Sequence, residues 1–225
     1  MKRIVLIALA LASLSSAVSA EGGISFGAKA GIYSASMTQV PAGLQNTSFR
    51  NGFAAGVSID YEFIEGLSLQ PEVLYVRKGF DGQGWSSTYG ADFDYIEIPL
   101  LIKLTVQTKS FMRPVLFVGP SLGINLRANV DLNVVNRMTD EQLAGSLDYS
   151  EVMNGAEFSL VFGAGCDFDA GPGDITLDAR LDLGLSKTFK GGIATGELEG
   201  HEIQSTVYAG TSKNIGFALM LGYAL

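Results

Sequence analysis

The chain has 225 residues, of which 47% are hydrophobic and only 17% are charged, with 28 glycines, six prolines and one cysteine. A formal net charge of −8 offers no clustered basic surface to nucleic-acid phosphates, so we expect no nucleic-acid partner. The high apolar content excludes a disordered chain, and a single cysteine excludes an internal disulfide.

The first twenty residues have the pattern of a secretory signal peptide. Two basic residues precede an apolar run over residues 4–14, and the run ends in small residues up to Ala20. This run is about half as long as the roughly 20 apolar residues that a membrane-spanning helix needs. We therefore predict cleavage after Ala20, which divides the chain into a signal peptide, residues 1–20, and a mature barrel domain, residues 21–225.

In the mature chain, large apolar residues recur at every second position, which is the pattern of strands. No stretch is apolar for long enough to form a spanning helix. The alternation is clearest near the C-terminus, where Ile215, Phe217 and Leu219 share one parity and small residues share the other. In chain order it predicts eight strands, over residues 24–33, 52–64, 67–79, 93–107, 111–127, 155–169, 175–186 and 215–225.

One face of each predicted strand is apolar, and the other face carries the charges and many glycines. Small residues on the polar face suit a narrow packed interior better than a solvated exterior. We therefore predict that the polar faces line a lumen and that their charges pair there, because buried charges need partners. The predicted lumenal charge network consists of Lys29, Glu72, Glu97, Lys103, Arg113, Asp178, Arg180 and Asp182.

The connections between the predicted strands alternate between short and long. The short ones cover residues 65–66, 108–110 and 170–174, and the long ones cover residues 34–51, 80–92, 128–154 and 187–212. This alternation is typical of bacterial outer-membrane barrels. It predicts an all-β fold, an eight-stranded antiparallel up-and-down transmembrane β-barrel with short periplasmic turns and long extracellular loops.

Aromatic residues at the strand ends support an apolar face that points toward lipid, because aromatic girdles mark membrane interfaces. One rim is predicted to carry Phe26, Phe63, Phe168 and Tyr223, and the other Phe53, Tyr75 and Phe158. Prolines inside strands each remove one hydrogen-bond donor, so we expect local bulges there. These prolines are Pro71, Pro99, Pro114 and Pro120.

Four short motifs resemble a known family. They are Gly27-Ala28-Lys29-Ala30-Gly31, Leu69-Gln70-Pro71-Glu72-Val73-Leu74-Tyr75 with Lys78-Gly79, Tyr95-Ile96-Glu97-Ile98-Pro99-Leu100 with Lys103, and Val118-Gly119-Pro120. In these motifs the chain resembles the PorT-like outer membrane protein beta-barrel domain family, which is common in Bacteroidota, and the resemblance covers essentially the whole mature chain. It implies a small barrel in the cell outer membrane, similar in architecture to the OmpA and OmpX barrels, without catalytic residues.

One feature departs from the usual pattern of outer-membrane strands, which commonly end in an aromatic residue. This chain ends in Tyr223-Ala224-Leu225. Recognition by the outer-membrane assembly machinery is then expected to depend on Tyr223 and the terminal leucine.

An eight-stranded barrel is just wide enough for its own side chains to fill it, so we expect a closed lumen and a structural or surface-interaction role through the extracellular loops. Trp85 and Tyr89 are candidate loop contacts for a partner, although interfacial anchoring explains such aromatics equally well. We expect a monomer without catalytic residues, cofactor or metal. Its expected partners are outer-membrane lipid, the assembly machinery and an unidentified extracellular ligand or protein.

Three alternatives come from other functional classes. The first is a loop-based outer-membrane enzyme that uses His201 as the base, beside Glu199, Glu202 and Ser205. The second is a narrow transport pore. The third is a soluble periplasmic barrel that binds a lipid inside, with Phe217 and Leu219 facing the interior.

Overall fold

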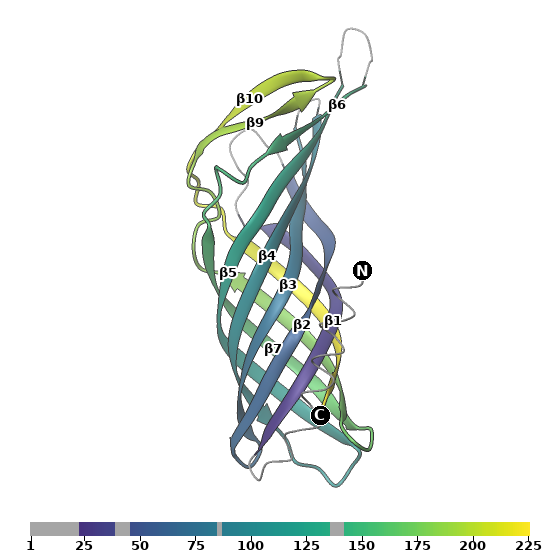
Figure 1. The fold of residues 1–225 in the computed structure, drawn as a ribbon. Coiled ribbons are helices and arrows are strands. Elements are labelled where there is room, and N and C mark those ends of the chain that lie inside the picture. The colour runs from purple at the N-terminus through teal and green to yellow at the C-terminus, as the bar shows by residue number, and fades with distance from the viewer. Residues whose placement is uncertain (1–22, 39–45, 85–86, 136–141) are drawn as a thin grey trace, which may run out of the picture.

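The computed structural model describes residues 23–38, 46–84, 87–135 and 142–225, which form one antiparallel sheet of eleven strands (Figure 1). Across these ranges no helix has the length and apolar character needed to span a membrane. The predicted signal peptide and Trp85 lie outside the described residues. The strands are β1 (Ile24–Met37), β2 (Asn46–Ile64), β3 (Leu67–Gln83), β4 (Ser87–Thr105), β5 (Met112–Val135), β6 (Gln142–Asp148), β7 (Ala156–Asp169), β8 (Asp174–Gly184), β9 (Gly192–Leu198), β10 (His201–Val207) and β11 (Asn214–Ala224).

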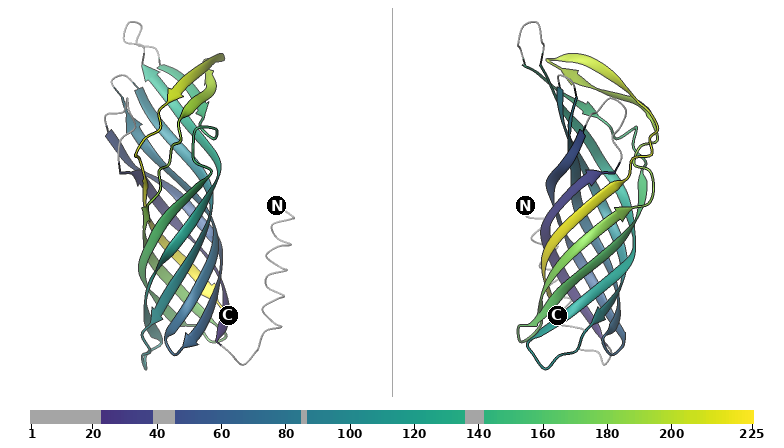
Figure 2. Two further views of the ribbon diagram at one scale, coloured as in Figure 1. Left: turned by 90° about the vertical axis from the view of Figure 1, so that its left-hand side faces the viewer. Right: turned by 180° about the vertical axis from the view of Figure 1, so that it is seen from behind.

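Eight of the strands close into a barrel, as the sequence predicts. Neighbouring strands pair in the order β5, β4, β3, β2, β1, β11, β8 and β7, and β7 pairs with β5 to complete the ring. The start of β1 and the end of β11 lie at the same end of the barrel, where short turns join the other strands. We call this the short-turn end and the opposite one the long-loop end. The figures show the strands tilted strongly against the barrel axis (Figures 1 and 2).

The outer wall of the barrel is a continuous apolar belt. Phe217 and Leu219 on β11 are 49% and 54% exposed, and every other strand of the ring also carries exposed large apolar side chains. Such a surface is unfavourable in water and favourable against lipid. The alternative of a soluble barrel with Phe217 and Leu219 facing the interior is therefore wrong.

Aromatic side chains gather at both edges of this belt. At the short-turn end the rings of Phe111 and Phe168 lie 6.2 Å apart, and Tyr223 is partly exposed on the outer wall. At the other edge the rings of Phe53 and Tyr75 lie 5.6 Å apart. The two girdles give the limits of the hydrocarbon layer.

Beyond the second girdle the two faces of the strands exchange their polarity. On β3, Val73 and Tyr75 face outward within the belt. Further along the same strand, Arg77 and Asp81 face outward, and Phe80 is buried on the inner side. A strand in water needs an apolar inside and a polar outside, so the exchange marks the point where the wall leaves the hydrocarbon.

A bulge accompanies this exchange on the neighbouring strands. Asp94 of β4 pairs with Arg127 of β5, but the next residue, Tyr95, pairs with Asn125. Leu126 is therefore an extra residue on β5, and the parity of β5 changes there. Arg127 and the outward-facing residues that follow it are polar. Beyond the girdle β5 therefore has a polar outer face, as β3 does.

The strands extend much further at the long-loop end than the sequence suggests. Residues 80–83 and 87–92, predicted as part of a loop, continue β3 and β4, and the predicted loops over residues 128–154 and 187–212 contain the end of β5 together with β6, β9 and β10. These predictions are wrong because the alternation continues with its faces exchanged. Of the three additional strands, β6 pairs with β5, β9 pairs with β6, and β10 pairs with β9. Together they form an arch over this end (Figures 1 and 2).

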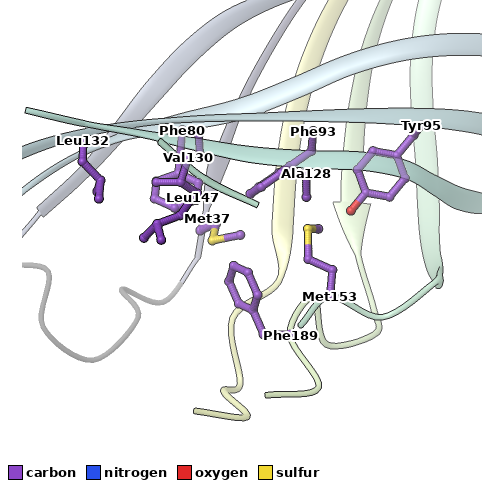
Figure 3. Close-up of a cluster of buried hydrophobic side chains, with 11 residues drawn as sticks. Met37, Phe80, Phe93, Tyr95, Ala128, Val130, Leu132, Leu147, Met153 and Phe189 are labelled. Atoms are coloured by element: carbon purple, nitrogen blue, oxygen red, sulfur yellow. The ribbon is translucent and has the colours of Figure 1, made fainter. Parts of the chain in front are cut away.

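An apolar cluster, which we call the apolar cap, lies beneath the arch. Side chains from β3, β4 and β5 meet Met153 and Phe189, which come from connecting segments on the other side (Figure 3). The rings of Phe80 and Phe93 lie 6.0 Å apart, and those of Phe93 and Phe189 lie 6.5 Å apart. The cap consists of Met37, Phe80, Ala91, Phe93, Tyr95, Ala128, Val130, Leu132, Leu147, Met153 and Phe189.

The predicted bulges at Pro71, Pro99, Pro114 and Pro120 are wrong. The register shifts of the barrel lie elsewhere, between Phe49 and Ala54, between Glu62 and Ile64, and at the Asp94–Tyr95 step. Pairing before and after each proline keeps the same register. A proline removes one N–H donor without inserting a residue, so the ladder continues past it.

The belt predicts how an outward charge affects stability. Leu219→Arg places a charge near the middle of the hydrocarbon and should destabilise the barrel by about 2–4 kcal/mol. Asn133→Arg, on the outer face of β5 beyond the girdle, should change stability by less than about 0.5 kcal/mol. Urea unfolding of the protein in lipid vesicles measures both variants. Equal effects of the two variants would show that the belt does not face lipid.

Candidate functional site

The barrel lumen is lined by charged side chains that are almost completely shielded from solvent. In the described residues, charges of both signs line it, and most of them form ion pairs with charges on other strands. Burial of an unpaired charge is expensive, so each pair depends on the strands that hold both partners in place. The buried charged residues are Lys29, Glu72, Lys78, Glu97, Glu157, Asp167, Asp178, Arg180 and Asp182.

The first group, the central charge cluster, joins β1, β3 and β8. Arg180 donates two hydrogen bonds to the carboxylate of Glu72, at 2.6 and 3.0 Å, and a third to Asp178 at 2.9 Å. Lys29 bridges the same two acids, at 2.9 Å from Glu72 and 3.0 Å from Asp178. The amide of Gln70 also donates to Glu72. Two bases and two acids therefore form one closed network, in which each charge has at least two partners.

The second group, the upper charge cluster, lies between the central cluster and the apolar cap. Lys78 pairs with Glu97 and lies 3.3 Å from Asp182, which also accepts a 2.8 Å hydrogen bond from the Tyr33 hydroxyl. The ammonium of Lys78 lies 5.0 Å from the centre of the Tyr95 ring. Cation–π contact and ion pairing together hold this single base between two acids.

Glu157 occupies the next position toward the cap and is held by neutral donors. Its carboxylate accepts hydrogen bonds from the hydroxyl of Tyr95 at 2.9 Å and from the amide of Asn214 at 2.7 Å. Tyr95 itself belongs to the apolar cap. The polar lumen and the apolar cap therefore meet at this side chain.

The third group lies toward the short-turn end. Lys103 pairs with Asp167 at 2.7 Å and with Asp60 at 3.3 Å. At the mouth itself Arg113 pairs with Asp174, and about a third of each side chain is exposed. The predicted residue Arg113 therefore lies at the rim rather than in the packed lumen, because β5 begins only one residue before it.

The structure distributes the eight predicted network residues over these separate groups. Lys29, Glu72, Asp178 and Arg180 contact one another, whereas Glu97 and Asp182 meet only through Lys78, and Lys103 and Arg113 have partners of their own. The prediction missed five residues that bond to members of this network or lie beside them, although each of the five lies on the polar face of its strand. These are Tyr33, Asp60, Lys78, Glu157 and Asp167.

Small spaces lie between these groups. A void of about 20 Å³ lies beside the upper cluster, and one of about 40 Å³ lies between the central and short-turn groups. A space of about 100 Å³ lies at the short-turn mouth. Because a single water needs roughly 10–15 Å³, the two inner voids have room for isolated waters.

The outer face of the sheet at the long-loop end carries a wide polar groove of about 500 Å³. Arg50 crosses this face, donating to Asp92 at 2.8 and 2.9 Å and to Asp81 at 2.6 Å. It lies flat because Gly90 beneath it has no side chain, and a Cβ there would come within 2.6 Å of the guanidinium. The hydrogen bond to Asp92 raises the pKa of Arg50 further above its ordinary value.

The remaining candidate residues have less elaborate surroundings. Tyr89 lines the groove, accepts a 2.7 Å hydrogen bond from the Ser87 hydroxyl and packs against the apolar cap. His201 and Ser205 lie four residues apart on β10, roughly 13 Å at about 3.3 Å per residue, which is far beyond hydrogen-bond reach. Among the described residues no group of three or more His, Cys, Asp and Glu side chains is arranged to hold a metal ion.

Burial predicts unequal costs for breaking two arginine pairs. Arg180→Met leaves Glu72 and Asp178 without their best donor in the closed lumen and should cost about 3–5 kcal/mol. The matched control is Arg77→Met, which breaks a half-exposed pair with Asp94 and should cost less than about 1 kcal/mol. Unfolding in detergent micelles, followed by heat-modifiable gel migration, measures both. Equal costs would contradict the buried network.

The sequence matches, over residues 12–190, the family described as "Outer membrane protein beta-barrel domain". No curated protein matches it. Among solved structures it is similar to a major outer membrane protein from Thermus thermophilus, with 10% identity, a TM-score of 0.50, and coverage of 90% of this chain and 100% of that one. It is also similar to Neisserial surface protein A, with 14% identity, a TM-score of 0.48, and coverage of 90% and 98%.

A third similar structure is the outer membrane protein OprG from Pseudomonas aeruginosa, with 10% identity, a TM-score of 0.47, and coverage of 91% of this chain and 97% of that one. At such identities the likeness concerns the fold alone. The family match covers most of the chain and agrees with the closed ring and its apolar belt. The chain therefore belongs to the outer membrane protein beta-barrel domain family and resides in the cell outer membrane.

Proposed function

We propose that this protein is a closed outer-membrane barrel that acts through its extracellular sheet, in a structural or surface-interaction role. In this family of architectures the short turns face the periplasm, so the apolar cap and the arch lie outside the cell. The observation that carries the proposal is that the wall continues far beyond the membrane as a folded sheet, while side chains fill the lumen below it.

The filled lumen argues against transport. Three groups of paired charges follow one another along the barrel axis, and the voids between them have room for isolated waters. The apolar cap closes the extracellular end. A path for ions or solutes would require several buried pairs to separate together, at a cost of several kcal/mol for each.

The length of the wall argues for a role outside the membrane. β5 has 24 residues, which corresponds to roughly 80 Å along the strand at about 3.3 Å per residue. A tilted membrane crossing needs only about 9–11 residues. The exchange of faces at Leu126 leaves the last nine residues of β5, from Arg127 onward, in the extracellular sheet, and anchoring alone gives no reason for that extension.

We also propose that the chain belongs to the PorT-like branch of the family. The motifs that carry this resemblance contain Lys29, Glu72, Lys78, Glu97 and Lys103, and each of these residues forms an ion pair in the lumen. The lumenal network thus gives a physical reason for those motifs. A cleaved signal peptide, insertion by the assembly machinery and a monomeric state in outer-membrane lipid complete the proposal.

Conductance tests the closed lumen. The purified protein in a planar lipid bilayer should show no steady channel, while a general porin added to the same bilayer should show open-channel steps. Steady conductance on the nanosiemens scale from the protein itself would refute the closed barrel and favour the transport alternative.

Enzyme assays test the non-catalytic role. The separation of His201 from Ser205 leaves no base beside a nucleophile on β10. We therefore expect no lipase, acyltransferase or protease activity from the purified protein, and no difference between it and His201→Ala. Activity that the His201→Ala variant lacks would establish the enzyme alternative.

A further inference from the structure

We propose that the free edge of β10 is a docking site for an extended basic segment of another protein, which pairs with β10 as an additional strand. The inference rests on the proposed function and deepens it, because it names the surface and the chemistry of the partner. The lumenal charges are not involved.

The first observation is that β10 ends the sheet. It pairs with β9 through seven consecutive register positions, from His201 opposite Leu198 to Val207 opposite Gly192, without a shift. In the described part of the chain no strand pairs with its other side, and every other strand has at least two neighbours. The outer edge of β10 therefore presents N–H and C=O groups that can accept a partner strand.

The second observation is that three common protections of an edge strand are absent from β10. Natural edge strands avoid association through proline, lysine or a bulge, and β10 contains none of these. Its sequence includes the β-branched residues Ile203, Thr206 and Val207. A two-residue turn at Glu199 and Gly200, both with positive φ, joins it tightly to β9. The edge is therefore formed before any partner arrives.

The third observation concerns charge. Asp81, Asp131, Glu197 and Glu202 lie on a single register row that crosses the outer face from β3 to β10. Asp81 pairs with Arg50, but the other three acids form no ion pair in the described residues. Glu197 and Glu202 lie directly opposite each other, which is unfavourable for two like charges. A basic side chain added to this row next to Glu202 relieves that repulsion.

The inner face of β10 favours apolar side chains on the added strand. Ile203 and Val207 are half-buried and pack against the apolar cap. An added strand places alternate residues next to them, so apolar residues at those positions extend the cap. The occupant is therefore a segment in which apolar and basic residues alternate.

The same row of acids disfavours a second copy of this chain as the occupant. Two β10 strands paired edge to edge would bring two rows of acids together, and β10 contributes no lysine or arginine to neutralise them. Complementary charge instead favours a foreign basic strand, because electrostatic complementarity both attracts the right partner and repels the wrong one.

A synthetic peptide tests the proposal directly. The probe is a nine-residue peptide in which lysine alternates with valine or threonine, titrated onto the full-length protein in lipid nanodiscs. One control peptide carries glutamate in place of each lysine, and a second carries N-methylated backbone amides that cannot pair. We expect only the first peptide to bind, with weaker binding at higher salt and with slower hydrogen exchange at the amides of β10.

Charge-reversal variants localise the binding. Glu202→Lys should weaken it at least tenfold, and the matched control Glu65→Lys, at a periplasmic turn, should leave it unchanged. Absence of binding, equal binding by both variants, protection away from β10, or self-association of the protein through β10 would each overturn the docking site. These results are independent of bilayer conductance, which tests the closed barrel, so the two proposals can fail separately.

Discussion

Every backbone N–H and C=O group in the hydrocarbon must find its partner within the protein, because no water is there to replace it. A sheet meets this condition only when it has no edge, and here the pairing of β1 with β11 and of β5 with β7 closes the ring. Closure makes one face of every strand contact lipid and the other face contact the opposite wall. The apolar belt, the glycines of the polar face and the paired lumenal charges all follow from this constraint.

The same constraint ends where the membrane ends, and the structure changes accordingly. Up to Tyr75 the outer face of β3 is apolar, and from Arg77 onward it is polar, while the inner side changes from charged residues to the apolar cap. Outside the hydrocarbon an edge no longer carries a prohibitive cost. Only there does the sheet leave the ring through β6, β9 and β10, and its terminal edge lies in water.

Much of the barrel could be predicted from the sequence, because each strand has one face toward lipid and one toward the lumen and its apolar and polar residues therefore alternate. The eight strands followed from parity, and their closure and the inward charges followed from parity together with the alternating connection lengths, the small residues of the polar face and the positions of the aromatic residues. The extracellular sheet could not, because Phe80 and Phe93 reverse the polarity that defined the faces and Leu126 shifts the parity of β5. The partners of Lys78 were also hidden, since Glu97 of the neighbouring β4 and Asp182 of the distant β8 reach it through strand registers that no local pattern reveals.

The most direct test of this account follows β3 across the membrane boundary. In lipid nanodiscs, nuclear Overhauser effects distinguish residues that contact acyl chains from those that contact water. The account predicts acyl-chain contacts at Val73 and Tyr75, water contacts at Arg77 and Asp81, and neither at Phe80. Acyl-chain contacts at Asp81 or Phe80 would contradict the exchange of faces, and with it the division between a membrane barrel and an extracellular sheet.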